Sequence, residues 1–194
     1  MANAPHRRAT YEDVLAAPEH VVAEVVDGVL YTNPRPAMPH AAAASALQGE
    51  IGPPFGRGRG GPGGWIIVLE PELHLHEDIV VPDLAGWRRE RMPVLPDAAF
   101  TETAPDWLCE VISPKTARLD RMTKLPVYRR EGVRHVWLVD PRARTLEVFR
   151  LEAERYSLLG TWGEADVARL EPFDAIELDL SVLWADVERA PDDA

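Results

Sequence analysis

Alternating apolar and polar positions along the chain predict a series of strands. Val21–Val26 and Val29–Thr32 flank Asp27-Gly28, a dipeptide that suits the type I′ turn of a β-hairpin. Further strands are expected at residues 65–76, 78–87, 105–113, 135–140 and 145–151, with short ones near 156–158 and 168–170. The pattern predicts a β-rich fold that begins with a hairpin.

Helical signals are fewer than strand signals. We expect helices at residues 11–17 after Thr10, at 40–51 in an Ala-rich stretch, at about 116–131 before Gly132, and at 182–188 after Ser181. The stretch GPPFGRGRGGPGG at residues 52–64 holds seven glycines and three prolines. Such a composition predicts a flexible loop.

One predicted strand carries an acid among apolar residues. Both faces of residues 105–113 are largely apolar, so Glu110 should be at least half buried whichever face is the core. A buried carboxylate is costly unless it meets a cation or hydrogen-bond donors. Asp83, after Pro82 in the preceding strand, would repel it, and a divalent cation between the two acids would remove that repulsion. Lys124, in the following helix, could hold a phosphate or a water.

Composition narrows the class of protein. The chain has 194 residues, 46% of them hydrophobic and 27% charged, which suits a single globular domain spanning residues 1–194. No signal peptide and no apolar run of about 20 residues is present, so a cytoplasmic protein with no membrane association is expected. One cysteine excludes a disulfide framework. The net charge of −11 argues against a general nucleic-acid binder, although cationic residues cluster at 118–134.

Several of these residues form a family pattern. Pro82-Asp83 is followed by Glu110-Val111-Ile112-Ser113-Pro114, by Asp120, Lys124 and Tyr128, and by Gly132-Val133 and HVWLVDP. In this order they resemble the Uma2 family of restriction-endonuclease-like proteins, within the PD-(D/E)XK nuclease superfamily. The likeness reaches upstream to Glu24 with Asp27-Gly28 and to His40, and covers about residues 10–188.

The resemblance implies an α/β fold in which helices flank a mixed central sheet. It implies a Mg²⁺-dependent endonuclease, with Mn²⁺ as a substitute, that hydrolyses phosphodiester bonds in DNA. Asp83, Glu110 and the Val111 carbonyl would bind the ion, and Lys124 would orient the attacking water and stabilise the developing charge. The superfamily's usual lysine position is Ile112 here, so the role of Lys124 depends on the turn after Pro114.

Four further residues are accessory candidates, each with a plainer alternative. Glu24 could join the metal shell or face solvent on the hairpin. His40 could act in the site or cap its helix, and Tyr128 could be core or a hydrogen-bond partner. Glu72 could lie near Asp83 or belong to a polar strand face.

The main candidates also have structural interpretations. Asp83 could cap a turn, Glu110 could pair with Arg118, and Lys124 could form a surface pair with Asp120. Two rival functions follow: a catalytically silent nuclease-fold binding module, or a metal-binding protein using the face that Glu70, Glu72, His74 and His76 would share. A homodimer is expected by analogy with nucleases that cut both strands.

Overall fold

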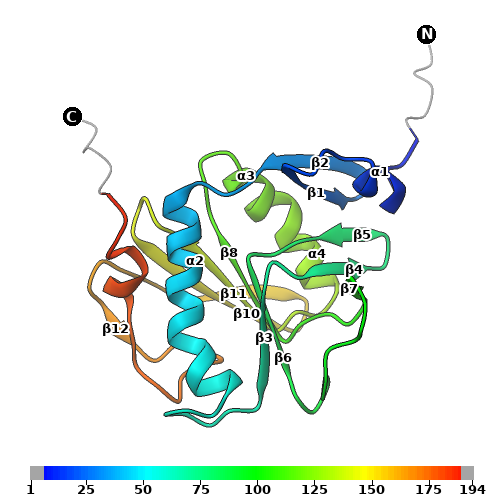
Figure 1. Ribbon diagram of the computed structural model, residues 1–194. Coiled ribbons are helices and arrows are strands. Elements are labelled where there is room, and N and C mark those ends of the chain that lie inside the picture. The colour runs from blue at the N-terminus through cyan, green and yellow to red at the C-terminus, as the bar shows by residue number, and fades with distance from the viewer. Residues whose placement is uncertain (1–6, 189–194) are drawn as a thin grey trace.

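The computed structural model describes residues 7–188, which form three sheets with helices packed around them (Figure 1). The six-stranded sheet has the order β11-β10-β9-β8-β6-β3 and the five-stranded sheet the order β2-β1-β5-β4-β7, while β12 and β13 pair alone. The strands are β1 (Val21–Val26), β2 (Val29–Pro34), β3 (Trp65–Leu69), β4 (Glu72–Leu75), β5 (Asp78–Val80), β6 (Leu84–Arg88), β7 (Phe100–Thr101), β8 (Trp107–Val111), β9 (His135–Asp140), β10 (Thr145–Glu152), β11 (Arg155–Gly163), β12 (Val167–Ala168) and β13 (Leu178–Asp179).

The helical segments are short apart from one. They are α1 (Tyr11–Leu15), α2 (Met38–Ile51), η1 (Gly52–Gly56), α3 (Ala117–Leu119), η2 (Asp120–Lys124), α4 (Leu125–Arg130) and η3 (Leu180–Trp184). No helix of the described residues is long and apolar enough to cross a membrane. The α/β class with a mixed sheet and an N-terminal hairpin is confirmed.

Two apolar cores cover the two faces of the six-stranded sheet. On one face, α2 and η3 pack against alternate residues of the central strands, among them Trp107, Cys109, Trp137 and Val139. On the other face, α4 and strands of the five-stranded sheet pack against Leu108 and Ile112. Because successive strand residues point to opposite faces, Glu110 lies on the α4 side, as Leu108 and Ile112 do.

The strand register explains how two acids far apart in the sequence become neighbours. In the antiparallel pair of β6 and β8, Leu84 is opposite Cys109 and Ala85 is opposite Leu108. One step further along the same register brings Asp83 opposite Glu110, and directly opposed residues share a face. Strand β9 lies parallel to β8 on its other side, so the helical segment between them crosses over the α4 face.

Two predicted strands are each broken in the structure. Residues 65–76 form β3 and β4, which belong to different sheets, and Glu70 between them has a positive φ of 46°. Residues 78–87 form β5 and β6, separated at Pro82. A proline lacks the N–H that a ladder needs, and here the chain leaves one sheet for the other instead of bulging within a single strand.

The segments around α2 and η3 also differ from the expectation. Residues 52–56 were expected to belong to a loop but continue α2 as a π-helical turn, and Phe55 is only 1% exposed there. The aromatic ring packs against Phe173 with 4.7 Å between ring centroids, so its burial fixes this end of the Gly/Pro stretch. The closing helix is a 3₁₀ segment at Leu180–Trp184, and Asp179, not Ser181, caps it.

Candidate functional site

Glu110 projects from the end of β8 into the α4 side of the molecule. It is 3% exposed, and both neighbours along the strand are also buried. Its Oε1 lies 2.8 Å from Nζ of Lys124 and accepts a hydrogen bond from the hydroxyl of Tyr128. The predicted burial is therefore confirmed, and the cation that compensates it is Lys124 rather than Arg118.

Lys124 reaches the site because the chain turns back after β8. A π-helical turn over Asp120–Lys124 leads into α4, with Pro126 in the first turn of that helix, where a missing N–H costs little. Lys124 does approach Asp120, as the alternative held, but it is 2% exposed, so this pair is buried and not at the surface. A lysine thus reaches Glu110 from the helical segment after β8, and not from position 112, which is an isoleucine.

Glu24 lies in the same cluster, although it comes from the N-terminal hairpin. Its Oε1 is 2.8 Å from Lys124 Nζ and accepts a hydrogen bond from the backbone N–H of Val81 at 2.9 Å. The side chain is 4% exposed, so the alternative in which Glu24 faces solvent is wrong. Strand β1 pairs with β5 beside the chain crossing at Val81, and this pairing carries Glu24 inwards.

Asp83 stands at the opening of the cluster with His40. Its Oδ2 is 3.1 Å from Nε2 of His40, at the start of α2, and accepts the backbone N–H of Val111 at 2.7 Å. The two side chains are 14% and 12% exposed. Burial alone would lower the pKa of His40, but the hydrogen bond to Asp83, the charges of Asp83 and Asp120 and the Val111 backbone together raise that pKa above its usual value.

A further acid, Asp120, joins the cluster. It is 3% exposed, its Oδ1 lies 3.9 Å from Lys124 Nζ, and its backbone N–H donates to the Thr116 carbonyl at 2.9 Å. From the sequence, Asp120 was expected only as part of the family pattern and as a surface partner of Lys124, not as a site residue. Its spacing of four from Lys124 was the available signal, because residues i and i+4 share a helix face.

The buried charges of this cluster do not balance. Burial raises the pKa of Glu110 well above its usual value, Lys124 opposes the rise, and the charges of Asp120, Asp83 and Glu24 push it further up. Burial would lower the pKa of Lys124, but Glu110 and Glu24 hold it well above its usual value, so the ammonium stays charged. One lysine thus contacts three buried carboxylates, while Asp83 beside them is bound by His40.

The pKa values of two more buried groups in the cluster are also raised. Burial raises the pKa of Asp120 to about 6, with Lys124 opposing. Burial also raises the pKa of Tyr128 well above its usual value, and the neighbouring Glu110 raises it further. The phenol is therefore a hydrogen-bond donor over the physiological pH range.

Each of three acids is engaged through one oxygen. The contacts described above use Oε1 of Glu110, Oε1 of Glu24 and Oδ2 of Asp83, and none of them uses the second carboxylate oxygen. His40 Nδ1 is buried without a hydrogen-bond partner among residues 7–188, although the Val111 backbone lies close enough to raise the His40 pKa. In the described part of the chain no three His, Cys, Asp or Glu side chains converge closely enough to hold a metal by themselves.

The rival polar face is not formed. Glu70 and His76 fall outside the strands, and both have a positive φ. His74 stacks on Phe100 at 3.6 Å between ring centroids, and its Nε2 binds Glu72 Oε1 at 2.7 Å. His76 binds Glu131 instead, so the four residues do not share a face, and Glu72 is engaged by His74 rather than beside Asp83.

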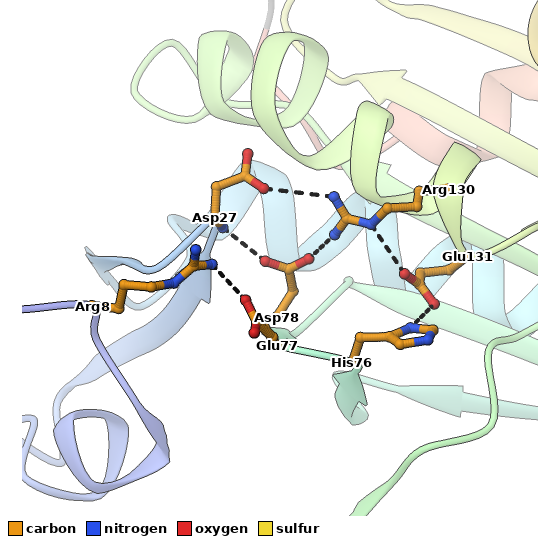
Figure 2. Close-up of a pocket in the computed structure, with 7 residues that line it drawn as sticks. All are labelled: Arg8, Asp27, His76, Glu77, Asp78, Arg130 and Glu131. Carbon is orange, nitrogen blue, oxygen red and sulfur yellow. Dashed lines mark hydrogen bonds and ion pairs between the residues drawn. The ribbon is translucent and has the colours of Figure 1, made fainter.

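A second polar cluster lies in an open pocket of about 590 Å³, on the outer side of the hairpin and α4 (Figure 2). Arg130 there contacts Asp27, Asp78 and Glu131, and Asp78 also accepts the backbone N–H of Asp27 at 2.7 Å. These contacts link the β1–β2 turn, the β4–β5 turn and the end of α4. The complete lining is Arg8, Asp27, His76, Glu77, Asp78, Arg130 and Glu131.

Comparisons with known proteins identify a family and a similar fold for the chain. The family model described as "Uma2: Putative restriction endonuclease" matches residues 9–183. A crystal structure described as a "putative nuclease belonging to DUF820 from Anabaena variabilis ATCC 29413" is similar in fold, with a TM-score of 0.69 and 22% sequence identity over 91% of this chain and 98% of that one. No curated protein matches. The chain belongs to the Uma2 family of restriction-endonuclease-like nucleases.

Proposed function

We propose that the protein is a Mg²⁺-dependent endonuclease that hydrolyses phosphodiester bonds in DNA. The observation that carries the proposal is the buried cluster in which three carboxylates share one lysine and Asp83 lies beside them, so that neighbouring acids raise the pKa of Glu110. Metal-free, such a site is electrostatically unfavourable, because buried like charges repel. A hard divalent cation would remove this cost, and the family's nuclease character makes phosphodiester hydrolysis the reaction that fits best.

The donor set fits Mg²⁺ better than a softer metal. Asp83 and Glu110 supply carboxylate oxygens, and Mg²⁺ is commonly bound by only one or two carboxylates together with waters and substrate phosphate. The second oxygens of these carboxylates and the Val111 carbonyl are the groups that we expect to hold it. When bound, Mg²⁺ would neutralise phosphate charge and make a water more acidic.

The remaining side chains orient and balance these groups. Lys124, 2.8 Å from Glu110, provides a fixed positive charge for the oxygens on which negative charge builds up. Tyr128 and Glu24 hold Glu110 and Lys124 in position through direct contacts. His40 holds one oxygen of Asp83, which leaves the other free to face the ion.

Cleavage of plasmid DNA tests the proposal. Purified protein with Mg²⁺ or Mn²⁺ should nick or cut supercoiled plasmid, and EDTA should stop the reaction. Asp83→Asn and Glu110→Gln should lower the rate by at least about 100-fold, since each removes a charge that acts directly on the reacting groups. Asp78→Asn gives a matched control, because it neutralises an equally buried acid that lies in the second cluster.

Thermal unfolding gives an independent readout. Mg²⁺ at about 100 times its Kd should stabilise the wild type by about 2.7 kcal/mol, and Asp83→Asn or Glu110→Gln should remove that stabilisation while Asp78→Asn keeps it. A folded wild type that neither binds Mg²⁺ nor cuts DNA would favour the catalytically silent module. Light scattering during size exclusion would test the proposed homodimer, which would supply two sites for two strands.

A further inference from the structure

The turn between β8 and α3 is tied to the floor of the site. The Ser113 and Thr116 hydroxyl oxygens lie 3.0 Å apart, and the backbone N–H of Thr116 donates to Ser113 Oγ at 3.2 Å. The Thr116 carbonyl in turn accepts the backbone N–H of Asp120, which is part of the carboxylate cluster. The geometry of this turn is therefore fixed relative to the site.

Two cationic side chains on this segment are free to meet a ligand. Lys115 and Arg118 are both exposed, and neither forms an ion pair with any carboxylate of residues 7–188. Other arginines nearby are engaged, since Arg121 binds Glu147 and Arg130 binds Asp78. Arg118 and Asp120 are two residues apart in a helical segment, so the acid points inwards while the arginine points outwards.

The segment stands close to where the reaction would occur. Lys115 follows Val111 by four residues, so their Cα atoms are at most about 14 Å apart, which corresponds to about four nucleotides along one DNA strand. In Figure 1 the turn after β8 and α3 lie at the same end of the molecule as the start of α2 and the β1–β2 hairpin. His40 and Glu24, at the two sides of the cluster, come from those two elements.

We propose that Lys115 and Arg118 bind backbone phosphates of duplex DNA, with Lys115 within about four nucleotides of the bond that is cut. The proposal rests on the proposed function and adds a surface by which an acidic protein holds its substrate. With a net charge of −11, the chain gains little from long-range attraction to DNA. Contacts at this turn supply a local attraction instead, and they are independent of base sequence.

The salt dependence of DNA binding tests the surface directly. A fluorescein-labelled duplex of about 20 base pairs is titrated with the full chain in the presence of Ca²⁺. The titration is repeated at KCl concentrations from about 50 to 200 mM, and fluorescence anisotropy gives Kd at each concentration. The variant Lys115→Ala/Arg118→Ala is compared with Arg134→Ala/Arg155→Ala, which loses the same charge. Both control arginines are exposed, and they lie beside the start of β9 and the β10–β11 turn, at the opposite end of the sheet from the site.

We expect Kd to rise at least about tenfold for Lys115→Ala/Arg118→Ala, and the slope of log K against log salt to shrink by about 2, since each lost phosphate contact removes about 0.9. The control should change the slope by less than about 0.5. Equal changes in Kd and salt slope for both variants would overturn the proposed DNA-binding surface. A wild type that does not bind the duplex would overturn it as well. Cleavage by the wild type with an unchanged slope would refute the surface while the proposed function stands. Binding with the expected slope change but no cleavage would support the DNA-binding surface and refute the proposed function.

Discussion

The molecule contains two clusters of acidic and basic side chains that differ in how their charges are compensated. In the carboxylate cluster, Lys124 is buried and contacts three acids whose side chains are 4% to 5% exposed. In the pocket cluster of Figure 2, Asp27 and Glu77 are 67% and 76% exposed, so water solvates them. The two buried acids of the pocket, Asp78 and Glu131, both meet Arg130.

The difference marks the carboxylate cluster as the candidate active site. Solvated or directly paired acids cost little, so the pocket cluster is explained as a set of links between the hairpin and α4. Buried acids that outnumber their cations are costly, and a fold retains them where a bound ion or a reaction requires them. Counting buried carboxylates against buried cations therefore separates a candidate active site from a structural ion network.

The largest expected effect comes from removing the shared cation. Lys124→Met should destabilise the metal-free protein by about 3 to 5 kcal/mol, because it leaves Glu24 and Glu110 buried without a counter-charge. Arg130→Met should cost only about 1 to 2 kcal/mol, since half of that side chain is exposed and Asp78 keeps a backbone donor. Urea unfolding in EDTA measures both values.

A double variant provides the control for Lys124. Lys124→Met/Glu110→Gln should regain part of the lost stability, because it removes one of the two unpaired acids together with the lysine. Equal costs for Lys124→Met and Arg130→Met would mean that the two clusters do not differ in the way proposed.

A second prediction concerns pH. The pKa of Asp120 is raised to about 6 from the 3.8 expected for an aspartate, so the folded state binds a proton that the unfolded state has lost. The free energy of unfolding should therefore fall as pH rises from about 4 to above 6, by about 3 kcal/mol from this group. Asp120→Asn removes that part of the slope.

Unfolding in urea at several pH values, in EDTA, gives the measurement. Asp97 is exposed, and Asp97→Asn should parallel the wild type since water solvates that carboxyl in both states. If the free energy of unfolding has the same pH slope in the wild type and in Asp120→Asn, the pKa of Asp120 is not raised by its place in the carboxylate cluster.

The smallest effect is expected in the pocket cluster. Arg8 and Glu77 approach within 2.7 Å but are 62% and 76% exposed, so Arg8→Ala should change stability by less than about 0.5 kcal/mol. It should also leave DNA cleavage at the wild-type rate. A cost above about 1.5 kcal/mol in thermal or urea unfolding would show that the pocket cluster resembles the buried one more than its exposure indicates.

Local patterns in the sequence correctly indicated much of the fold. The Asp27-Gly28 hairpin, the Ala-rich helix and the strands at 107–111 and 135–140 all follow from turn chemistry and periodicity. The breaks at Glu70 and Pro82 were not recognised, because a run of apolar residues does not reveal where a chain passes from one sheet to another. Whether the Gly/Pro stretch starts as a loop was likewise decided by a distant partner, Phe173, against which Phe55 packs.

For the site, the sequence by itself determined that Glu110 would be buried and in need of a cation, since both faces of its strand are apolar. Asp83 and Lys124 were candidates from their own chemistry, and the family pattern added Glu24 and His40. Only the tertiary structure decided that Lys124 bridges Glu24 and Glu110 and that Asp120 joins them. Such contacts depend on sheet register and on how a helix returns over the sheet, and these are set by packing among segments far apart in the chain.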